Sequence, residues 1–281
     1  MKTKIFLITS FIAILFCIGC DSSDKTADET NLSTNNQIAV DSKIDASIED
    51  VSNIAEDQFS VKQSNTARSS ETMHPFLPSC AIVTWTYANG TFTGTIDFGT
   101  EGCALTNGNV LKGKITLSFS GNFTTSEQMI TYSFDEFYHN GIKIQGSRTI
   151  TRTLKSTELL AEVHPVFTNS VDITVTFEDG SSYTRTGNRT KEMIDGNDWE
   201  DRVFLVTGSY TTSKSNGDTW SCTIQTPLRY EMACKKSIPV SGTVLKVNNG
   251  VETVIDYGTG ECDNLANVTT NGVTTTIELK R

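Results

Sequence analysis

VTWTYANGTFTGTIDF (residues 83–98) alternates apolar or aromatic side chains with polar ones on both sides of an Asn-Gly pair. Asn and Gly tolerate the positive φ that a two-residue hairpin turn requires. With Asn89-Gly90 in the turn, Trp85 faces Gly94 and its ring covers the bare backbone there. The stretch therefore predicts an antiparallel hairpin with one apolar face and one polar face.

Further Asn-Gly and Asp-Gly pairs recur along the chain, mostly between β-prone runs. They are Asn140-Gly141, Asp179-Gly180, Asn216-Gly217, Asn249-Gly250 and Asn271-Gly272. Hairpin signals repeated in this way are typical of an antiparallel meander. We expect an all-β fold, sandwich or open-barrel-like, with about a dozen strands in a single domain over residues 73–281.

The pair at 216–217 allows a second test of register. A two-residue turn there places Ser215 opposite Asp218. Trp220, Cys222, Ile224 and Leu228 then share a face with Val203 and Leu205. We expect this face to belong to the core.

The N-terminus resembles a bacterial lipoprotein signal. Two lysines precede an apolar run that is too short to span a membrane, and the run ends in Cys17-Ile18-Gly19-Cys20. We expect residues 1–19 to be removed and Cys20 to be lipidated, with palmitate among its acyl chains. An ordinary cleaved signal ending near Gly19 is the alternative.

Residues 20–72 form the acidic part of a chain whose formal net charge is −10. Their polar composition predicts a flexible tether. Within it, Ile44, Ile48, Val51 and Ala55 recur at helical spacing and predict an amphipathic helix over 42–58, packed on the domain or formed transiently. An acidic domain without a basic cluster argues against nucleic acid and anionic lipid surfaces as partners.

Two similar phrases, TIDFGTEGC (95–103) and VIDYGTGEC (254–262), each end a hairpin with a cysteine. Another cysteine precedes each hairpin, and an exported protein permits disulfides. We expect the pairs Cys80–Cys103 and Cys234–Cys262. Cys222 is left over and alternates with apolar residues, so we expect it to be a buried, unreactive thiol.

The phrases also carry acidic residues. Asp97 and Asp256 each stand two residues before a Gly, where a carboxylate accepts backbone N–H groups of the turn. We favour this local structural role. A calcium loop is the first alternative, using Asp97 and Glu101, or Asp256, Glu261 and Asp263. Paired catalytic carboxylates are the second.

Motifs for catalysis or cofactors do not appear. The three histidines are scattered, and no nucleotide, dinucleotide or zinc pattern occurs, so no cofactor is expected. The stretch FDEFYHNG (134–141) reads as a solvent-facing hairpin end. The loop with Asp195, Asp198 and Trp199 suits stacking on a sugar face with hydrogen bonds to its hydroxyls, but packing of Trp199 on the sheet edge is the simpler interpretation.

The signal, the start CDSSDKTADE, the two phrases, GSRTITRT (146–153) and GNRTKEMIDG (187–196) together resemble a group of uncharacterised cell-envelope lipoproteins from Bacteroidetes-type bacteria. The resemblance implies an outer-membrane lipoprotein, with the cell surface slightly favoured over the periplasmic face. It implies no activity.

We therefore expect a non-catalytic β domain that is structural, adhesive or glycan-contacting. Its partners would be the membrane, through the lipid anchor alone, and a polysaccharide or an envelope protein. One alternative is a glycan hydrolase using two of Asp135, Glu136, Asp195, Asp198 and Glu200. The other is a periplasmic carrier with an apolar ligand in an open interior.

Overall fold

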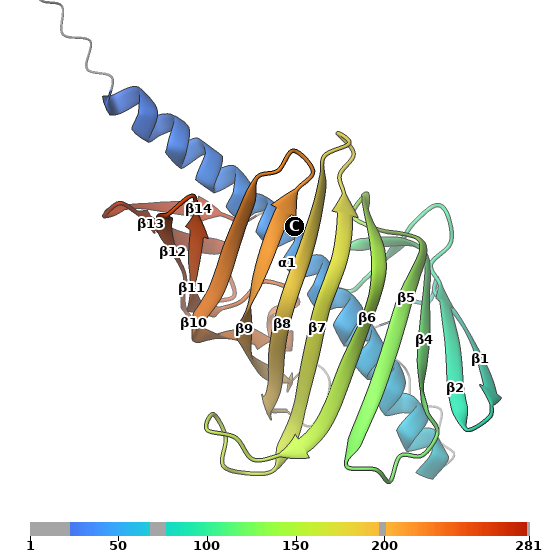
Figure 1. Cartoon of the computed structure of the whole chain (residues 1–281). Coiled ribbons are helices and arrows are strands. Elements are labelled where there is room, and N and C mark those ends of the chain that lie inside the picture. The colour runs from blue at the N-terminus through green and yellow to red at the C-terminus, as the bar shows by residue number, and fades with distance from the viewer. Residues whose placement is uncertain (1–22, 68–76, 197–200, 280–281) are drawn as a thin grey trace, which may run out of the picture.

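A single antiparallel sheet curves around one long helix (Figure 1). The computed structural model describes residues 23–67, 77–196 and 201–279. The helix is α1 (Ser23–Ala67). The strands are β1 (Ile82–Ala88), β2 (Thr91–Asp97), β3 (Cys103–Ala104), β4 (Val110–Ser120), β5 (Glu127–His139), β6 (Ile142–Lys155), β7 (His164–Thr176), β8 (Ser182–Asp195), β9 (Val203–Lys214), β10 (Thr219–Glu231), β11 (Ser241–Asn248), β12 (Val251–Thr259), β13 (Leu265–Thr270) and β14 (Val273–Glu278).

The predicted meander is confirmed. Each strand pairs with the next one along the chain, except that β2 pairs directly with β4 and the short β3 lies beside β4. In the described part of the chain no ladder joins β1 to β14, so the 14-stranded sheet is an open shell rather than a closed barrel. We call strands β1–β14 the shell.

Four turns have the two-residue geometry that the sequence predicts. Their asparagines, Asn89, Asn140, Asn249 and Asn271, have φ of 49° to 51°, and the following glycines also have positive φ. The first hairpin has the predicted register, with Trp85 opposite Gly94. A Cβ on Gly94 would lie 2.5 Å from the Trp85 ring, so the ring occupies the space that a side chain would need.

The hairpin at 216–217 differs from its prediction. Lys214 donates its N–H to the C=O of Asp218 at 2.8 Å, so the loop contains three residues rather than two. Trp220 consequently faces Thr212, whose side chain is buried. The expected register was wrong by one residue, and such a slip turns a strand's side chains to the opposite face. Leu205 is therefore not on the face of Trp220.

The N-terminal segment differs most from expectation. The sequence predicts a flexible tether over 20–72 with a helix over 42–58, whereas the structure has one continuous helix from Ser23 to Ala67. Nearly every residue from Asp41 to Phe59 is buried. The physical reason is enclosure: α1 runs along the concave side of the shell (Figure 1), so its polar and apolar faces both find partners. Among the described helices, none combines the length and apolarity needed to cross a membrane.

The apolar face of α1 forms the centre of the core. Ile44, Ile48, Val51 and Ile54 are at most 4% exposed and belong to one hydrophobic cluster with the strands. Near the end of the helix, the Phe59 ring meets the Phe119 ring edge-on with centroids 5.1 Å apart. Each such aliphatic side chain contributes about 1.5–3 kcal/mol by burial. The helix is thus part of the same folded unit as the shell.

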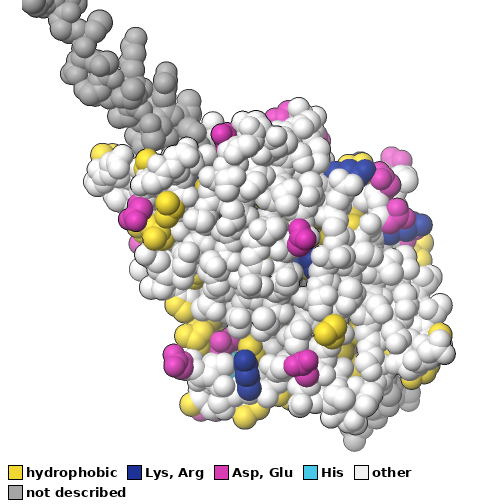
Figure 2. Space-filling model, viewed as in Figure 1, with side chains coloured by type: hydrophobic (Ala, Val, Ile, Leu, Met, Phe, Trp, Pro, Cys, Tyr) yellow, Lys and Arg dark blue, Asp and Glu magenta, His cyan; other side chains and the backbone are white. Residues whose placement is uncertain are grey.

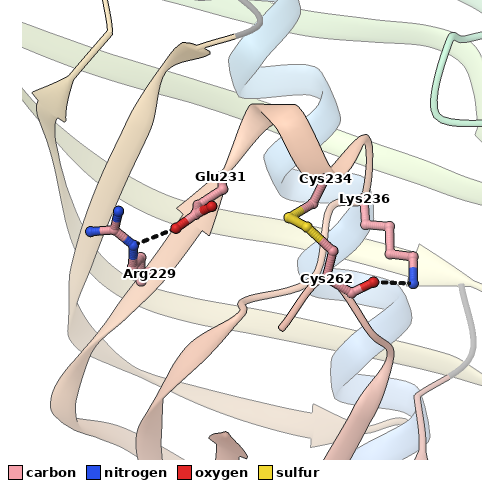
Figure 3. Close-up of a disulfide and its surroundings, with 5 residues drawn as sticks. All are labelled: Arg229, Glu231, Cys234, Lys236 and Cys262. Carbon is pink, nitrogen blue, oxygen red and sulfur yellow. Dashed lines mark hydrogen bonds and ion pairs between the residues drawn. A yellow bond between two sulfur atoms is a disulfide. The ribbon is translucent and has the colours of Figure 1, made fainter. Parts of the chain in front are cut away.

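Both expected disulfides are present, Cys80–Cys103 and Cys234–Cys262. Figure 3 shows the second one, with Lys236 donating to the Cys262 carbonyl at 2.9 Å and α1 passing behind. Cys222 is a free thiol and is buried, as expected.

Candidate functional site: the charged interior

The second face of α1 carries acidic residues that meet basic residues on the inner face of the shell. The helix contributes Asp41, Asp45, Glu49, Asp50 and Glu56, and the shell contributes His139, Arg185, Arg189, Lys191 and Lys246. None of these side chains is more than 11% exposed. We call this set the charged interior.

Strand β8 supplies most of the positive charge because its alternation is unusual. Arg185, Arg189 and Lys191 point inward, while Thr186 and Asn188 between them are exposed on the outer face. The acidic stripe runs beside this strand in the same direction. Asp41 to Glu56 spans about 22 Å along a helix, and Arg185 to Lys191 spans about 20 Å along a strand. The two stripes therefore match along their whole length.

Asp41 is the first contact point of the two stripes. Its carboxylate pairs with Arg185 and, at 3.0 Å, with the Lys246 ammonium of β11. The Trp220 indole N–H donates to the same carboxylate at 2.8 Å. The Cys222 sulfur lies 3.8 Å away, and burial together with this carboxylate raises the pKa of its thiol to about 12. The thiol is therefore held in its unreactive form.

Asp45 is the second contact point. It pairs with both Arg185 and Arg189, the latter at 2.6 Å. The two guanidinium groups lie 4.0 and 4.9 Å from the centre of the Tyr210 ring, an arrangement of cation–π contacts. Gly187 stands between the arginines and directly opposite Tyr210, and a Cβ there would lie 2.4 Å from the Ser209 carbonyl oxygen. A glycine is therefore required at this position.

Lys191 is the third contact point and serves two carboxylates. Its ammonium lies 2.9 Å from Glu49, 3.2 Å from Glu56 and 2.6 Å from the Asn53 side-chain oxygen. Burial opposes its charge, but the two carboxylates outweigh burial and raise the pKa of Lys191. The pKa of Glu56 is also raised, because burial disfavours its ionised form more than Lys191 stabilises it.

Asp50 connects the helix to two loops from opposite ends of the shell. It accepts hydrogen bonds from Asn107 and Asn109, in the loop after Cys103, and from Ser237, just after Cys234. The Asn107 amide also donates to the Ser237 hydroxyl at 3.1 Å. The two disulfide-bonded loops thus meet over the helix and bridge a shell that no strand ladder closes.

His139 also binds Asp50, through its Nε2 at 2.8 Å. Ser237, His139 and an aspartate therefore lie together, which invites comparison with a hydrolase triad. In a triad the serine bonds the histidine, whereas here Ser237 donates to the carboxylate. The group is buried and reads as a structural bridge.

The acidic residues of the two repeated phrases have the local role that we favoured. Asp97 accepts the N–H of Gly99, and Asp256 accepts the N–H of Gly258, each at 2.9 Å. This hydrogen bond, with the Lys114 ammonium 3.2 Å away, lowers the pKa of Asp97. In the described ranges no three His, Cys, Asp or Glu side chains are grouped as a metal site would require.

Each phrase also borders a surface cleft. Asp97, Asp135 and Glu136 line one of about 470 Å³. The other, of about 230 Å³, is lined by Asp256, Glu261 and Asp263. A glycosidase acid needs a raised pKa, but backbone N–H bonding lowers the pKa of Asp97 and Lys143 lowers that of Glu136. Glu101 is exposed and contacts Thr100.

The expected sugar-stacking loop is only partly visible. Asp195 ends β8, is exposed, and accepts the N–H of Gly196 at 2.8 Å. Trp199, Asp198 and Glu200 lie outside the described residues. Asp135 is on β5, three strands away from β8, which is about 14 Å at the usual strand spacing. Asp195 therefore does not converge with Asp135 or Glu136.

The outer face of the shell is rich in side-chain hydroxyl groups. One row of directly paired residues crosses eight strands and consists of Thr93, Ser118, Thr131, Thr149, Ser170, Asn188, Ser209 and Thr223. We call it the hydroxyl row. A parallel row on β6–β9 contains Thr151, Thr168, Thr190 and Thr207. Figure 2 shows this face as mainly uncharged polar side chains and backbone, with few charged groups.

The charged interior was not anticipated from the sequence. Two signals for it exist in retrospect: acids at helical spacing in 41–56, and Arg185, Arg189 and Lys191 at even spacing in a strand. Either pattern alone is typical of a solvent-exposed face. Only the pairing of the two in the structure shows that both are buried. Comparison with protein-family models, with curated proteins and with solved structures found no match.

Proposed function

We propose that this chain is a lipid-anchored, non-catalytic protein of the cell envelope whose outer face contacts polysaccharide. The observation that carries the proposal is the hydroxyl row, an uncharged array of donors and acceptors across eight strands. A neutral polysaccharide offers the same groups in return and brings no charge that the face would have to match.

The anchor part of the proposal is supported by the N-terminal sequence. Cys20 stands three residues before the first residue of α1. Eleven residues of helix, 23–33, precede the first described buried side chain, Thr34. They correspond to about 16 Å of helix. A lipidated Cys20 would therefore carry the shell on a short helical stalk.

The two alternative functions have less support. An apolar carrier needs an empty, apolar interior, whereas α1 and its ion pairs occupy the concave side of the shell. A hydrolase needs converging carboxylates with separated pKa values, and the described candidates either lie on distant strands or have a lowered pKa.

The anchor is tested by metabolic labelling with palmitate in cells that express the full chain. We expect Cys20→Ser to abolish labelling. Cys17→Ser is the matched control, because it changes a neighbouring cysteine that is not the proposed lipid acceptor. Equal labelling of the wild type and Cys20→Ser would refute the anchor. Protease shaving of intact and permeabilised cells then distinguishes the surface from the periplasm.

The glycan contact is tested by affinity electrophoresis in gels that contain neutral polysaccharides. Ser170→Lys combined with Asn188→Lys places two charges in the hydroxyl row, and we expect the retardation by the polysaccharide to be lost. Thr274→Lys, which is exposed on β14, is the control. Unchanged thermal melting shows that the fold is intact. If neither wild type nor control is retarded by any polysaccharide, the contact is refuted while the anchor stands.

A further inference from the structure

We propose that the inner face of the shell is a binding site for α1 of a second copy, so that two chains can exchange helices. The seat, as we call it, is the surface of β8–β11 that carries Arg185, Arg189, Lys191 and Lys246. The exchange requires neither the lipid anchor nor the polysaccharide contact.

The helix α1 contacts the shell through side chains alone, as a ligand does. In the described residues no backbone hydrogen bond connects residues 34–64 to a strand or to a loop. The contacts are ion pairs, hydrogen bonds such as Trp220 to Asp41, and apolar packing. A second copy's helix can therefore replace α1 without changing any strand ladder.

The seat is specific for the charge pattern of α1. The seat recognises acids at three levels of the helix, Asp41, Asp45, and Glu49 with Glu56, spread over about four turns. An arbitrary acidic segment would leave some of the buried cations unpaired, which is costly. A second copy supplies the same residues at the same spacing. Exchange of an identical element is also a low-cost route to a dimer.

During synthesis, α1 is made well before the strands that bind it. The contacts of α1 with β8–β11 join residues that lie far apart, from 135 positions for Lys191 and Glu56 to 211 for Asn248 and Gln37. At the usual rate of synthesis, α1 waits for about 7 to 40 s before the strands of its seat exist. During this interval the helix of one copy is available to the seat of another.

The inner face of the shell is accessible before a helix is bound to it. The shell is open between β1 and β14, and its ends are bridged by loops that bond Asp50 of the helix. A shell without a helix lacks this bridging carboxylate. The seat is therefore most open before any helix is bound, which is when the helix of a second copy would enter.

The experiment uses two differently tagged versions of the chain, each expressed from Asp21 onward. The helix variant carries Asp45→Lys and Glu49→Lys, and the seat variant carries Arg189→Glu and Lys191→Glu. Each variant alone brings like charges together in the interior. We expect each variant alone to have a folding equilibrium constant at least about a hundredfold lower, since breaking even one buried pair has an effect of that size. Each should therefore be recovered in a clearly smaller soluble amount than the wild type.

Co-expression is the decisive step. The intact helix of the seat variant matches the intact seat of the helix variant, so exchange restores one native interface. We expect a soluble complex that contains both tags in equal amounts and has twice the mass of the chain. Recovery of neither variant, or of the helix variant bound to some other protein, would overturn the proposal.

A wild-type experiment covers the case in which the variants fold alone. Two tagged wild-type copies are co-expressed, and the same copies are mixed after separate purification. We expect co-purification of both tags after co-expression, and at least tenfold less after mixing, because a seated helix leaves slowly. Absence of a mixed complex after co-expression would overturn the proposal, and equal amounts in both cases would indicate surface association instead.

Discussion

At the scale of single residues, the charged interior consists of buried ionisable groups that need a nearby group of opposite charge. Glu56 illustrates this, because burial raises the pKa of its carboxyl above the ordinary 4.5 while Lys191 opposes the shift. The folded state thus holds the Glu56 proton more tightly than the unfolded state does. By linkage, the stability contributed by Glu56 decreases as the pH rises from 4.5 through the raised pKa.

This sign leads to a pH-dependent prediction for Glu56→Gln. The variant does not ionise at this position. Its free energy of unfolding should therefore increase relative to that of the wild type as the pH rises above 4.5. Urea unfolding of both proteins between pH 4.5 and 8 measures the difference. The exposed Glu101→Gln serves as the control. A difference for Glu56→Gln that does not vary with pH would contradict the assignment.

Gly187 gives a steric prediction at the same scale. In Gly187→Ala the new Cβ would meet the Ser209 carbonyl at 2.4 Å, and backbone in a paired strand has little freedom to move. We expect a loss of about 1–3 kcal/mol. Gly94→Ala is the comparison, because its Cβ would meet only the partly exposed Trp85 ring, which can turn aside. Thermal melting should therefore rank Gly187→Ala below Gly94→Ala, and the reverse order would count against this account.

At the scale of elements, β8 points its basic side chains inward. Substitutions on its inner face should therefore destabilise the protein much more than substitutions on its outer face. Lys191→Met removes the ion-pair partner of the buried Glu49 and Glu56, which we expect to cost about 3–5 kcal/mol. Thr190→Val changes the neighbouring outward position and should stay within about 0.5 kcal/mol of the wild type. Denaturant unfolding measures both values. Similar effects of the two substitutions would mean that Lys191 is not buried among carboxylates.

The strands and turns of the fold could be predicted from sequence because their signals are local. Asn89 and Asn249 adopt the positive φ that a two-residue turn needs, and the hairpin around Asn89 has its predicted register. At Asn216 the same dipeptide forms a three-residue loop. Loop length there depends on the register with neighbouring strands, such as the Ser215 to Ser182 hydrogen bond, which no local pattern encodes.

The helix and the charged interior could be predicted only in part. The apolar spacing of Ile44, Ile48 and Val51 indicated a helix, and these residues do face the core. The acids of the same segment suggested solvent, because a charge is rarely buried without a partner. The cations that pair with Asp41, Asp45 and Glu49 lie more than 100 residues away, on β8 and β11. Neither the acidic segment nor the basic strand, taken alone, indicates that its charges are buried.

At the scale of the whole molecule, the shell is completed by side chains rather than by a strand ladder. Its two ends are held by the disulfides Cys80–Cys103 and Cys234–Cys262, and the loops beside them meet at Asp50. The disulfides close segments with sequence separations of 23 and 28 residues. Each is worth about 3–4 kcal/mol by chain entropy. The bridge and the disulfides should therefore act as one unit.

A double-mutant cycle tests this coupling. We expect Asp50→Asn to cost about 1–3 kcal/mol, because it weakens several buried hydrogen bonds at once. Replacing Cys80 and Cys103 by Ser frees the loop that holds Asn107 and Asn109. Part of the stabilisation from the hydrogen bonds between this loop and Asp50 is then already lost.

The combined variant should therefore be less destabilised than the sum, by about 0.5–3 kcal/mol. In the control cycle, Asp179→Asn replaces Asp50→Asn. Asp179 accepts hydrogen bonds from Ser181 within the β7–β8 loop, so the effect of this change should be additive with that of the disulfide change. Urea unfolding gives all the free energies. Strict additivity in the Asp50 cycle would mean that the loops keep their place without the helix, and that the shell closes by itself.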